Sequence, residues 1–283
     1  MHTIIRGESA NVIYRRLALK LSNEPDFEPE VRGLQTKEVI NCSLVLDNPR
    51  DNLVTLVERD IDLRYLAGEL CFYLSGSNKL TDINKYSSFW NKVSDDGEIV
   101  NSAYGYNLFV KNNNAGITQF DYVIDCLKAD IHTRKAVAFL SGPDDAKESK
   151  DNICTTTLQF LIRDGKLNMI TTMRSNDINY GLTYDLPFFT ILQQIVAIKL
   201  GVELGAYMHN VGSMHVYANF YEHLDKIKGS YKANEAIHML PEIVEHDIEH
   251  WFQEMFAYQD TGKKGLTTEF QQVLIRWLGK EKK

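Results

Sequence analysis

The segment TLQFLIRDGKLNMITTMRS, residues 157–175, restricts the possible folds of this chain more than any other stretch. Two runs rich in apolar and β-branched residues flank an Asp-Gly dipeptide, which favours the two-residue type I′ turn of a β-hairpin. In such a hairpin Arg163 lies opposite Lys166, and the same pairing continued to the open end places Cys154 opposite Ser175. The segment therefore predicts a long antiparallel hairpin, in a register that a β-bulge would shift.

The open end of this hairpin is expected to gather three side chains: Cys154, Arg174 and Ser175. A guanidinium beside a thiol stabilises the thiolate, which is the nucleophilic form of cysteine. Arginine and serine together also suit a phosphate group. The spacing alone leaves two interpretations open, a nucleophile beside an anion site or a strand-end cysteine among surface polar residues.

An apolar helix is predicted directly after the hairpin, over LPFFTILQQIVAIKLG. Pro187 suits its first turn and Gly201 its C-terminal end, and the apolar residues recur at helical spacing. Asp185 stands just before this run, where a carboxylate commonly caps the helix N-terminus. Capping and a role in binding are both open for Asp185 at this point.

The rest of the chain indicates a single α/β domain, because it holds no internal repeat and no Pro-rich linker. Apolar periodicity marks the other elements, and the C-terminal part is mainly helical in pattern. Further strands are expected at 39–46 and 135–140, and further helices at 62–76, 120–130 and 242–259.

Composition limits the class of protein. With 283 residues and 44% hydrophobic content, the chain is long enough for a sizeable core. A net charge of −7 argues against a nucleic-acid partner, because a surface that follows phosphates carries an excess of Lys and Arg. No apolar run of about eighteen residues and no apolar signal segment occurs. We therefore expect no membrane partner and a cytoplasmic location, in the host cytoplasm if a phage encodes the protein.

Four widely spaced cysteines without a CxxC pair indicate neither a zinc ribbon nor a disulfide framework, so we expect free thiols. Three of them stand in apolar surroundings typical of small core residues: Cys42, Cys71 and Cys126. His246 and His250 are one helical turn apart, a spacing that suits zinc, but they lack the HExxH order. An amphipathic helix face is the favoured interpretation, and no metal is expected.

Five motifs follow one another in a fixed order along the chain: DLRYLAGELCFYLSG, FWNKVSDDGEIVNSAYG, CTTTLQFLIRDGKL, MRSNDINYGL and NVGSMHVYANF. Together they resemble the thymidylate synthase superfamily. CTTTLQFLIRDGKL, MRSNDINYGL and NVGSMHVYANF match the family's catalytic cysteine, its Arg-Ser-x-Asp segment and its His-x-Tyr pair. DLRYLAGELCFYLSG and FWNKVSDDGEIVNSAYG match upstream segments in order and spacing. The resemblance covers roughly residues 30–225 and leaves 226–283 as a helical extension. It implies an α/β (α+β) fold in one domain over residues 1–283, with a mixed β-sheet flanked by helices and dimerising through the sheet.

Departures from the common pattern point to one branch of this family. Thr155 follows the cysteine where thymidylate synthases usually carry His, and Thr183-Tyr184-Asp185 replaces the Pro-Phe-Asn triplet that reads uracil. Asp185, ICTTT and NVGSMHVY instead resemble the phage-type deoxycytidylate hydroxymethylases. A carboxyl group accepts a hydrogen bond from the N4 amino group of cytosine. Its second contact, with cytosine N3, requires a proton, which either N3 or Asp185 carries.

The resemblance implies a one-carbon transferase. In the family reaction, Cys154 as thiolate adds to C6 of a pyrimidine nucleoside monophosphate, and C5 attacks the one-carbon unit of 5,10-methylenetetrahydrofolate. Water then gives a hydroxymethyl group, whereas hydride from the folate gives a methyl group. We expect hydroxymethylation of dCMP or CMP with release of tetrahydrofolate. A C5 methyltransferase acting on dCMP or dUMP and a non-catalytic nucleotide-binding dimer are the alternatives.

The same resemblance implies roles around the pyrimidine and the folate. Glu69 matches a buried glutamate that orders water and relays protons, and Tyr104 matches a tyrosine near C5 and the thiol. Asp177, Trp90 and Gly181 match residues around the folate pterin. A solvated helix-face Glu and a core Trp are the plainer alternatives, but Glu69 stands among apolar residues, where an unpaired charge is costly.

Phosphate and sugar contacts are implied in the same way. Arg174 and Ser175 match phosphate ligands from the same subunit, and Arg32 matches a mobile N-terminal arginine through a short motif. His215 and Tyr217 match the pair that contacts the sugar hydroxyl.

Two further cations imply a homodimer with shared active sites. Arg134 and Lys135 stand where the family places two arginines that reach into the neighbouring subunit's site. Lys135 departs from that pattern. Lysine offers a single ammonium group, whereas arginine offers a planar guanidinium with several donors, so the family pattern does not fix how the phosphate and the sugar are held. The choice between dCMP and CMP therefore stays open.

Overall fold

The computed structural model describes residues 2–142, 148–229, 232–235, 237, 239–245, 247–248 and 268–280. Its strands form one sheet in the order β1-β3-β7-β6-β5-β4, with β2 paired to β3. Pairing is parallel for β1/β3 and β6/β7 and antiparallel elsewhere, which confirms the expected mixed sheet. The bounds are β1 Thr3–Gly7, β2 Glu30–Val31, β3 Leu34–Leu46, β4 Val137–Phe139, β5 Thr155–Arg163, β6 Lys166–Asp177 and β7 Glu203–Tyr217.

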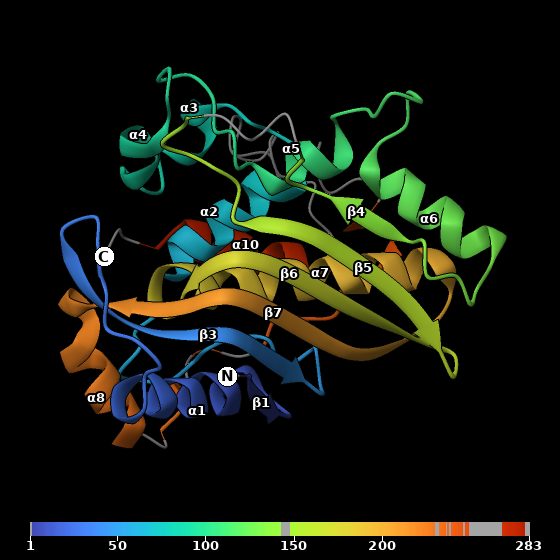
Figure 1. Ribbon diagram of the computed structural model, residues 1–283. Coiled ribbons are helices and arrows are strands. Elements are labelled where there is room, and N and C mark those ends of the chain that lie inside the picture. Colours follow the sequence, from blue (N-terminus) through green and yellow to red (C-terminus); the bar gives the residue numbers. More distant parts are fainter. Residues whose placement is uncertain are drawn as a thin grey trace.

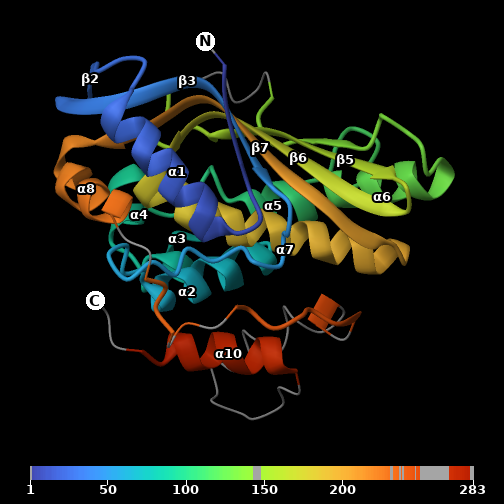
Figure 2. The same cartoon turned by 90° about the horizontal axis from the view of Figure 1, so that it is seen from below.

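The helices of the described chain lie on one side of this sheet. Figure 2 shows the sheet uppermost, α7 beneath it, α2 beneath α7 and α10 lowest. In Figure 1 the opposite face of the sheet is turned to the reader, and no described helix covers it. The bounds are α1 Ala10–Asn23, α2 Leu63–Leu74, α3 Leu80–Ile83, α4 Phe89–Val93, α5 Tyr104–Phe109, α6 Gln119–Ala129, η2 Ile178–Leu182, α7 Thr183–Leu200, η3 Ala218–Phe220, α8 Tyr221–Gly229 and α10 Glu269–Leu278.

Helix α7 is the centre of the core. Residues 186–197 are all buried, because the helix lies between the sheet and α2. The buried amide nitrogen of Gln193 donates there to the Leu167 carbonyl of β6 at 2.8 Å. Gly201 ends the helix with φ 65°, as the sequence predicts. Pro187 is the fifth residue of α7 and not in its first turn, because the helix begins at residue 183, directly after the π-helical turn η2.

The hairpin of β5 and β6 is confirmed, with both turn residues at positive φ as a type I′ turn requires. A register shift at the start of β5, however, moves the pairing by one residue, so that Thr155 pairs with Met173. The Arg174 N–H then donates to the Cys154 carbonyl at 2.9 Å. The expected pairing of Cys154 with Ser175 is therefore wrong, because a bulge places Arg174 there instead.

Two large elements are absent from the sequence predictions, helix α1 and strand β7. In β7 the inward positions include a buried histidine, His209, and two glycines interrupt the strand, Gly205 and Gly212. These residues hide the alternation that identifies a strand. The expected strands and the helices at 62–76 and 120–130 are confirmed as β3, β4, α2 and α6.

Other expectations have mixed outcomes. All four cysteines are free, but Cys126 is only half-buried, since it sits at the margin of the core. Most of the expected helix at 242–259, with His246 and His250, lies outside the described residues. Within the described part of the chain, no cluster of His, Cys, Asp and Glu suits a metal ion, and no helix is long and apolar enough to cross a membrane.

Candidate active site

A cavity of about 810 Å³ lies beside the start of β5. Residues from β3, α2, α4, α5, β6, η2, α7 and β7 line it. Arg134 and Lys135 do not: both are exposed, just ahead of β4. The other candidate residues all line the cavity: Arg32, Glu69, Trp90, Tyr104, Cys154, Arg174, Ser175, Asp177, Gly181, Asp185, His215 and Tyr217.

The parallel pairing of β6 and β7 brings two of the motifs together. Asp177 pairs with His215 in this register, two residues before Tyr217. The His215 and Tyr217 rings meet edge to face, with centroids 5.1 Å apart. Motifs that are distant in the sequence therefore share one end of the sheet.

Asp177 ends β6 and begins the π-helical turn. Its Oδ1 accepts from the N–H groups of Asn179 at 2.7 Å and Tyr180 at 2.5 Å. Its Oδ2 is buried and has no hydrogen-bond partner among the described residues. Burial raises the pKa of Asp177. An unpartnered carboxylate oxygen in a cavity wall is ready to accept from a ligand.

Cys154 lies half-buried with its Sγ 3.9 Å from the Asn152 carbonyl, to which the thiol donates. Arg174 Nη2 donates to the same carbonyl at 2.8 Å, and its Nε donates to the Ile153 carbonyl at 3.1 Å. Burial raises the pKa of Cys154, and the nearby Arg174 lowers it by less. The expected stabilisation of the thiolate by Arg174 is therefore present but outweighed, and the ligand-free site holds a thiol.

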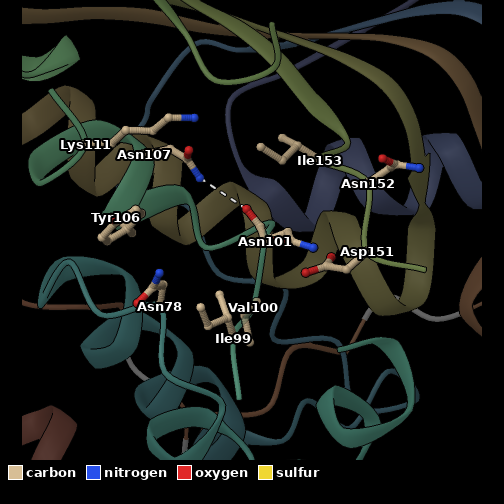
Figure 3. A pocket seen from close by; sticks show the side chains of 10 residues that line it. All are labelled: Asn78, Ile99, Val100, Asn101, Tyr106, Asn107, Lys111, Asp151, Asn152 and Ile153. Carbon is tan, nitrogen blue, oxygen red and sulfur yellow. Dashed lines mark hydrogen bonds between the residues drawn. The ribbon is translucent and has the colours of Figure 1, made fainter. Parts of the chain in front are cut away.

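The segment ahead of Cys154 lies between two cavities. A smaller polar one, of about 220 Å³, shares Asp151 and Asn152 with the main cavity (Figure 3). Asp151 Oδ2 accepts from the Ser102 N–H at 2.9 Å. This bond ties the approach to Cys154 to the turn before α5, which carries Tyr104. The other residues that line the smaller cavity are Asn78, Ile99, Val100, Asn101, Tyr106, Asn107, Lys111 and Ile153.

Glu69 projects from the buried face of α2. Its Oε1 accepts from the Tyr65 hydroxyl at 2.7 Å, and the Tyr73 hydroxyl lies 3.5 Å away. Trp90 Nε1 donates to the Tyr65 oxygen at 3.2 Å. Burial raises the pKa of Glu69 to about 7. The helix-face alternative is therefore wrong, since Glu69 is only 8% exposed.

Tyr104 belongs to a cluster of aromatic rings behind the cavity. It stacks on Tyr73 with centroids 5.0 Å apart and packs against Phe188 and Phe189 of α7. Burial raises the pKa of Tyr104 well above its ordinary value, with smaller contributions from Asp185 and Cys154. The Tyr104 hydroxyl is therefore neutral and close to both groups.

Asp185 does not cap α7. The helix begins at residue 183, and no side chain bonds to its first N–H groups at the cap position. The carboxylate that bonds to backbone N–H groups in this region is Asp177, at the start of η2. Burial, and then the Glu69 carboxylate, raise the pKa of Asp185 well above its ordinary value of 3.8. Asp185 is therefore a neutral carboxyl group in the cavity wall.

Arg59 is a buried residue of this region that the sequence analysis does not single out. Its Nη2 donates to the Asn179 carbonyl at 2.8 Å and its Nε donates to Thr183 Oγ1 at 3.1 Å. The guanidinium also lies 5.7 Å from the Tyr184 ring centroid. Arg59 therefore links η2 to α7 without lining the cavity. The sequence analysis misses it because its neighbours, VERDID, are typical of a charged surface segment.

Arg32 reaches the cavity from the tip of the β2–β3 hairpin. Arg32 and Gly33 have φ values of 55° and 74°, so the exposed arginine occupies a left-handed position in the turn.

Asn176 and His209 are buried polar residues near Asp185 that the sequence analysis also misses. The only sequence signal for these two residues is that each is a polar residue at a strand position facing the core, and this position is recognised only once the strands are known.

Comparison with known proteins agrees with this arrangement. The family model for thymidylate synthase matches residues 13–260. A thymidylate synthase of Bacillus phage phi3T is 31% identical over 156 residues, which are 54% of this chain and 55% of that protein. The same identity to the deoxycytidylate 5-hydroxymethyltransferase of Enterobacteria phage T4 extends over 237 residues, which are 77% of this chain and 91% of that protein.

A mixed sheet with helices on one face, and a cavity that holds Cys154, Arg174 and Asp177, are features of the thymidylate synthase fold. The chain belongs to the thymidylate synthase family of one-carbon transferases, whose co-substrate is methylenetetrahydrofolate. It matches about half the length of the phi3T synthase and most of the length of the T4 hydroxymethyltransferase.

Proposed function

We propose that this protein is a pyrimidine C5 hydroxymethyltransferase. It converts dCMP or CMP, 5,10-methylenetetrahydrofolate and water to the 5-hydroxymethyl nucleotide and tetrahydrofolate. The observation that carries the proposal is the Asp185 carboxyl in the wall of the Cys154 cavity, near enough to raise the pKa of that thiol. The family alternative, a methyltransferase, has relatives of equal identity in its favour.

A neutral carboxyl group suits cytosine. Its carbonyl oxygen accepts from the N4 amino group, and its hydroxyl donates to N3, whereas a carboxylate presents only acceptors to both positions. Burial keeps Asp185 in this neutral form. Transfer of its hydrogen to N3 withdraws electrons from the ring, which favours addition of sulfur at C6.

The reaction proceeds through a bond between Cys154 Sγ and C6. C5 then bonds to the one-carbon unit of the folate. Loss of the C5 proton supplies the electron pair that forms the exocyclic methylene, the carbon–nitrogen bond to the folate breaks, and tetrahydrofolate leaves. Water adds to this methylene, the C6–S bond breaks, and the thiolate is regenerated.

Glu69 and Tyr104 are proposed to serve the proton transfers. A carboxyl group with a pKa of about 7 exchanges protons readily near neutral pH. Glu69 is thus suited to position water and remove its proton. The neutral Tyr104 hydroxyl, near Cys154, is suited to hydrogen-bond the water molecule that takes the proton removed at C5.

Other residues that line the cavity are proposed to bind the folate, the phosphate and the sugar. The buried, unpartnered Asp177 Oδ2 fits an amino or ring N–H group of a pterin, with Trp90 and Gly181 in the same wall. Arg174, Ser175 and Arg32 are assigned to the phosphate. His215 and Tyr217 are assigned to the sugar. The proposed substrates also imply a cytoplasmic location.

A homodimer is part of the proposal. Arg134 and Lys135 are exposed and do not line the cavity of their own chain, and one sheet face carries no described helix. Pairing of two sheets places these cations at the partner's phosphate. Mixing inactive Arg134→Ala and inactive Cys154→Ala proteins under subunit exchange tests this. Recovery of about a quarter of the wild-type rate is expected, because half of the dimers then hold one intact site. No recovery excludes shared sites.

Turnover tests the reaction itself. The purified protein is incubated with methylenetetrahydrofolate and dCMP, CMP, dUMP or UMP, and nucleotide products are identified by mass and folate products by absorbance. A hydroxymethylcytosine nucleotide with tetrahydrofolate supports the proposal and settles the sugar. A methyl product with dihydrofolate makes the protein a methyltransferase, and tight binding without turnover makes it non-catalytic. Asp185→Asn is the matched variant: an unchanged base preference contradicts the role of Asp185.

A further inference from the structure

Helix α2 places a tyrosine on either side of Glu69. Tyr65, Glu69 and Tyr73 follow one another at intervals of four residues, so their side chains lie along one face of the helix. Both hydroxyls donate to the same carboxyl oxygen, Oε1, Tyr65 at 2.7 Å and Tyr73 at 3.5 Å. No described residue donates to the other oxygen, Oε2, which is not shut off from solvent. Because Glu69 lines the cavity, Oε2 is the oxygen left for a water molecule or a ligand.

The indole of Trp90, on α4, fixes the direction of the hydrogen bond from Tyr65. Trp90 Nε1 lies 3.2 Å from the Tyr65 oxygen and can only donate, so that oxygen is the acceptor. The hydrogen of the Tyr65 hydroxyl then needs an acceptor of its own, and within the described part of the chain Glu69 Oε1 is the only one in reach. A donor left without an acceptor away from water is costly. The hydrogen bonds therefore run one way, from Trp90 to Tyr65 and on to Glu69.

The neutral form of Glu69 has one hydrogen and two oxygens on which it can sit. Burial raises the pKa of Glu69 to about 7, so this form is present in neutral and acid solution. A hydrogen on Oε1 would face the hydrogen of the Tyr65 hydroxyl, or would force that hydroxyl to turn away from its acceptor. A hydrogen on Oε2 avoids this conflict.

We propose that Tyr65, oriented by Trp90, is a positioning residue that places the exchangeable hydrogen of Glu69 on Oε2, in the wall of the cavity. Glu69 then gives and takes protons at Oε2, while Oε1 holds the carboxyl group in place. Trp90 stands in the wall assigned to the folate, so this wall and the proposed base share one chain of hydrogen bonds. The place of the hydrogen in the ligand-free protein is independent of the proposed function; its use in turnover rests on that function.

Other titratable groups near Glu69 act on it as well. Besides Tyr65, those that interact with Glu69 are Tyr73 of α2, Tyr104 of α5, and Tyr184 and Asp185 of α7. Burial raises the pKa of each of these groups, so they are uncharged near neutral pH. All four remain in a Tyr65→Phe variant, so a difference between this variant and the wild type reports on the Tyr65 hydroxyl.

Neutron diffraction by a crystal of the ligand-free, full-length protein locates the hydrogen directly. The crystal is exchanged into heavy water at acid pD, below the pKa of about 7 at which Glu69 loses its hydrogen. We expect deuterium on Glu69 Oε2, and deuterium on the Tyr65 hydroxyl along the line to Oε1. Deuterium on Oε1, or a Tyr65 hydroxyl that points away from Glu69, overturns the proposal. The experiment uses the wild-type chain, so it decides the question even if a variant does not fold.

The pH profile of turnover gives a second readout. The bond from Tyr65 favours the carboxylate, so in Tyr65→Phe we expect Glu69 to keep its hydrogen to higher pH. The expected result is a loss in kcat of about tenfold below pH 7 that fades at alkaline pH, with KM for the nucleotide changed less than about twofold. Tyr73→Phe is the matched control, because it removes the longer bond to the same oxygen, and a much smaller change is expected. An equal loss at every pH, or equal profiles for the two variants, contradicts the proposal.

The outcomes separate this inference from the proposed function. Deuterium on Oε2 in a protein that does not hydroxymethylate cytosine nucleotides supports the inference and overturns the proposed function. Hydroxymethylation by a protein that carries the deuterium on Oε1 does the reverse.

Discussion

The Tyr65 hydroxyl donates to Glu69 Oε1 at 2.7 Å inside a wall of aromatic side chains. This bond favours the carboxylate, and burial opposes it more strongly, so the pKa of Glu69 lies at about 7 and not at 4.5. The folded protein therefore holds a proton on Glu69 at pH values where the unfolded chain has lost it.

The first prediction concerns stability. Glu69 stabilises the fold fully below pH 4.5, and this contribution is lost as the pH rises through about 7. Glu69→Gln, which keeps an acceptor for Tyr65, is therefore expected to exceed the wild type in unfolding free energy by roughly 1–3 kcal/mol above pH 7, and to match it at pH 4. Turnover is expected to be lost. Thermal unfolding at several pH values checks this; a constant difference at all pH values contradicts the assigned pKa.

A second prediction concerns the reactivity of Cys154. Because burial raises its pKa, alkylation of the ligand-free protein by iodoacetamide is expected to be slow at neutral pH and to accelerate as the pH rises. Arg174→Leu removes the group that lowers this pKa and is expected to slow the reaction further. Peptide mass mapping measures the rate, with Cys154→Ala reporting labelling at Cys126. Fast alkylation at neutral pH is incompatible with a resting thiol.

Gly181 gives a third prediction. A methyl group there would lie 2.0 Å from Asn176 Oδ1, so Gly181→Ala has to displace Asn176 or the π-helical turn. We expect a loss of about 1–3 kcal/mol in unfolding free energy and a fall in kcat. Gly229→Ala at the end of α8, where a Cβ atom meets nothing within 4 Å, is the matched control. Equal behaviour of the two variants would count against the close contact.

The fourth prediction concerns Arg59. Arg59→Met removes the donors to the Asn179 carbonyl and to Thr183, leaving the buried carbonyl without its partner. A cost of about 1–3 kcal/mol is expected in chemical denaturation. Because η2 joins Asp177 to α7, we also expect a higher KM for the folate. Arg59→Lys keeps the positive charge but lacks the planar guanidinium with its several N–H donors. It is therefore expected to recover only part of the lost stability and of the affinity for the folate. Full recovery with Lys would show that charge alone suffices.

Local preferences explain why parts of the fold are predictable. The Asp-Gly turn and the glycine that ends α7 depend on φ values that few residues adopt, so the β5–β6 hairpin and the end of α7 follow from neighbouring residues. The same local rules fail for β7, where Gly205, Gly212 and His209 obscure the pattern, and at the bulge that places Arg174 beside Cys154. A bulge depends on the tertiary contacts at the edge of the sheet, and no fixed sequence pattern identifies it.

The sequence by itself determined the family, the hairpin, the central helix and twelve of the residues that line the cavity. Only the tertiary structure decided the chemical state of those side chains. Glu69, Cys154 and Asp185 all have raised pKa values because distant segments remove water from them. The bond from Asn176 to His209 likewise joins residues 33 positions apart in the sequence. Burial and such contacts arise from three-dimensional packing, so no local pattern encodes them.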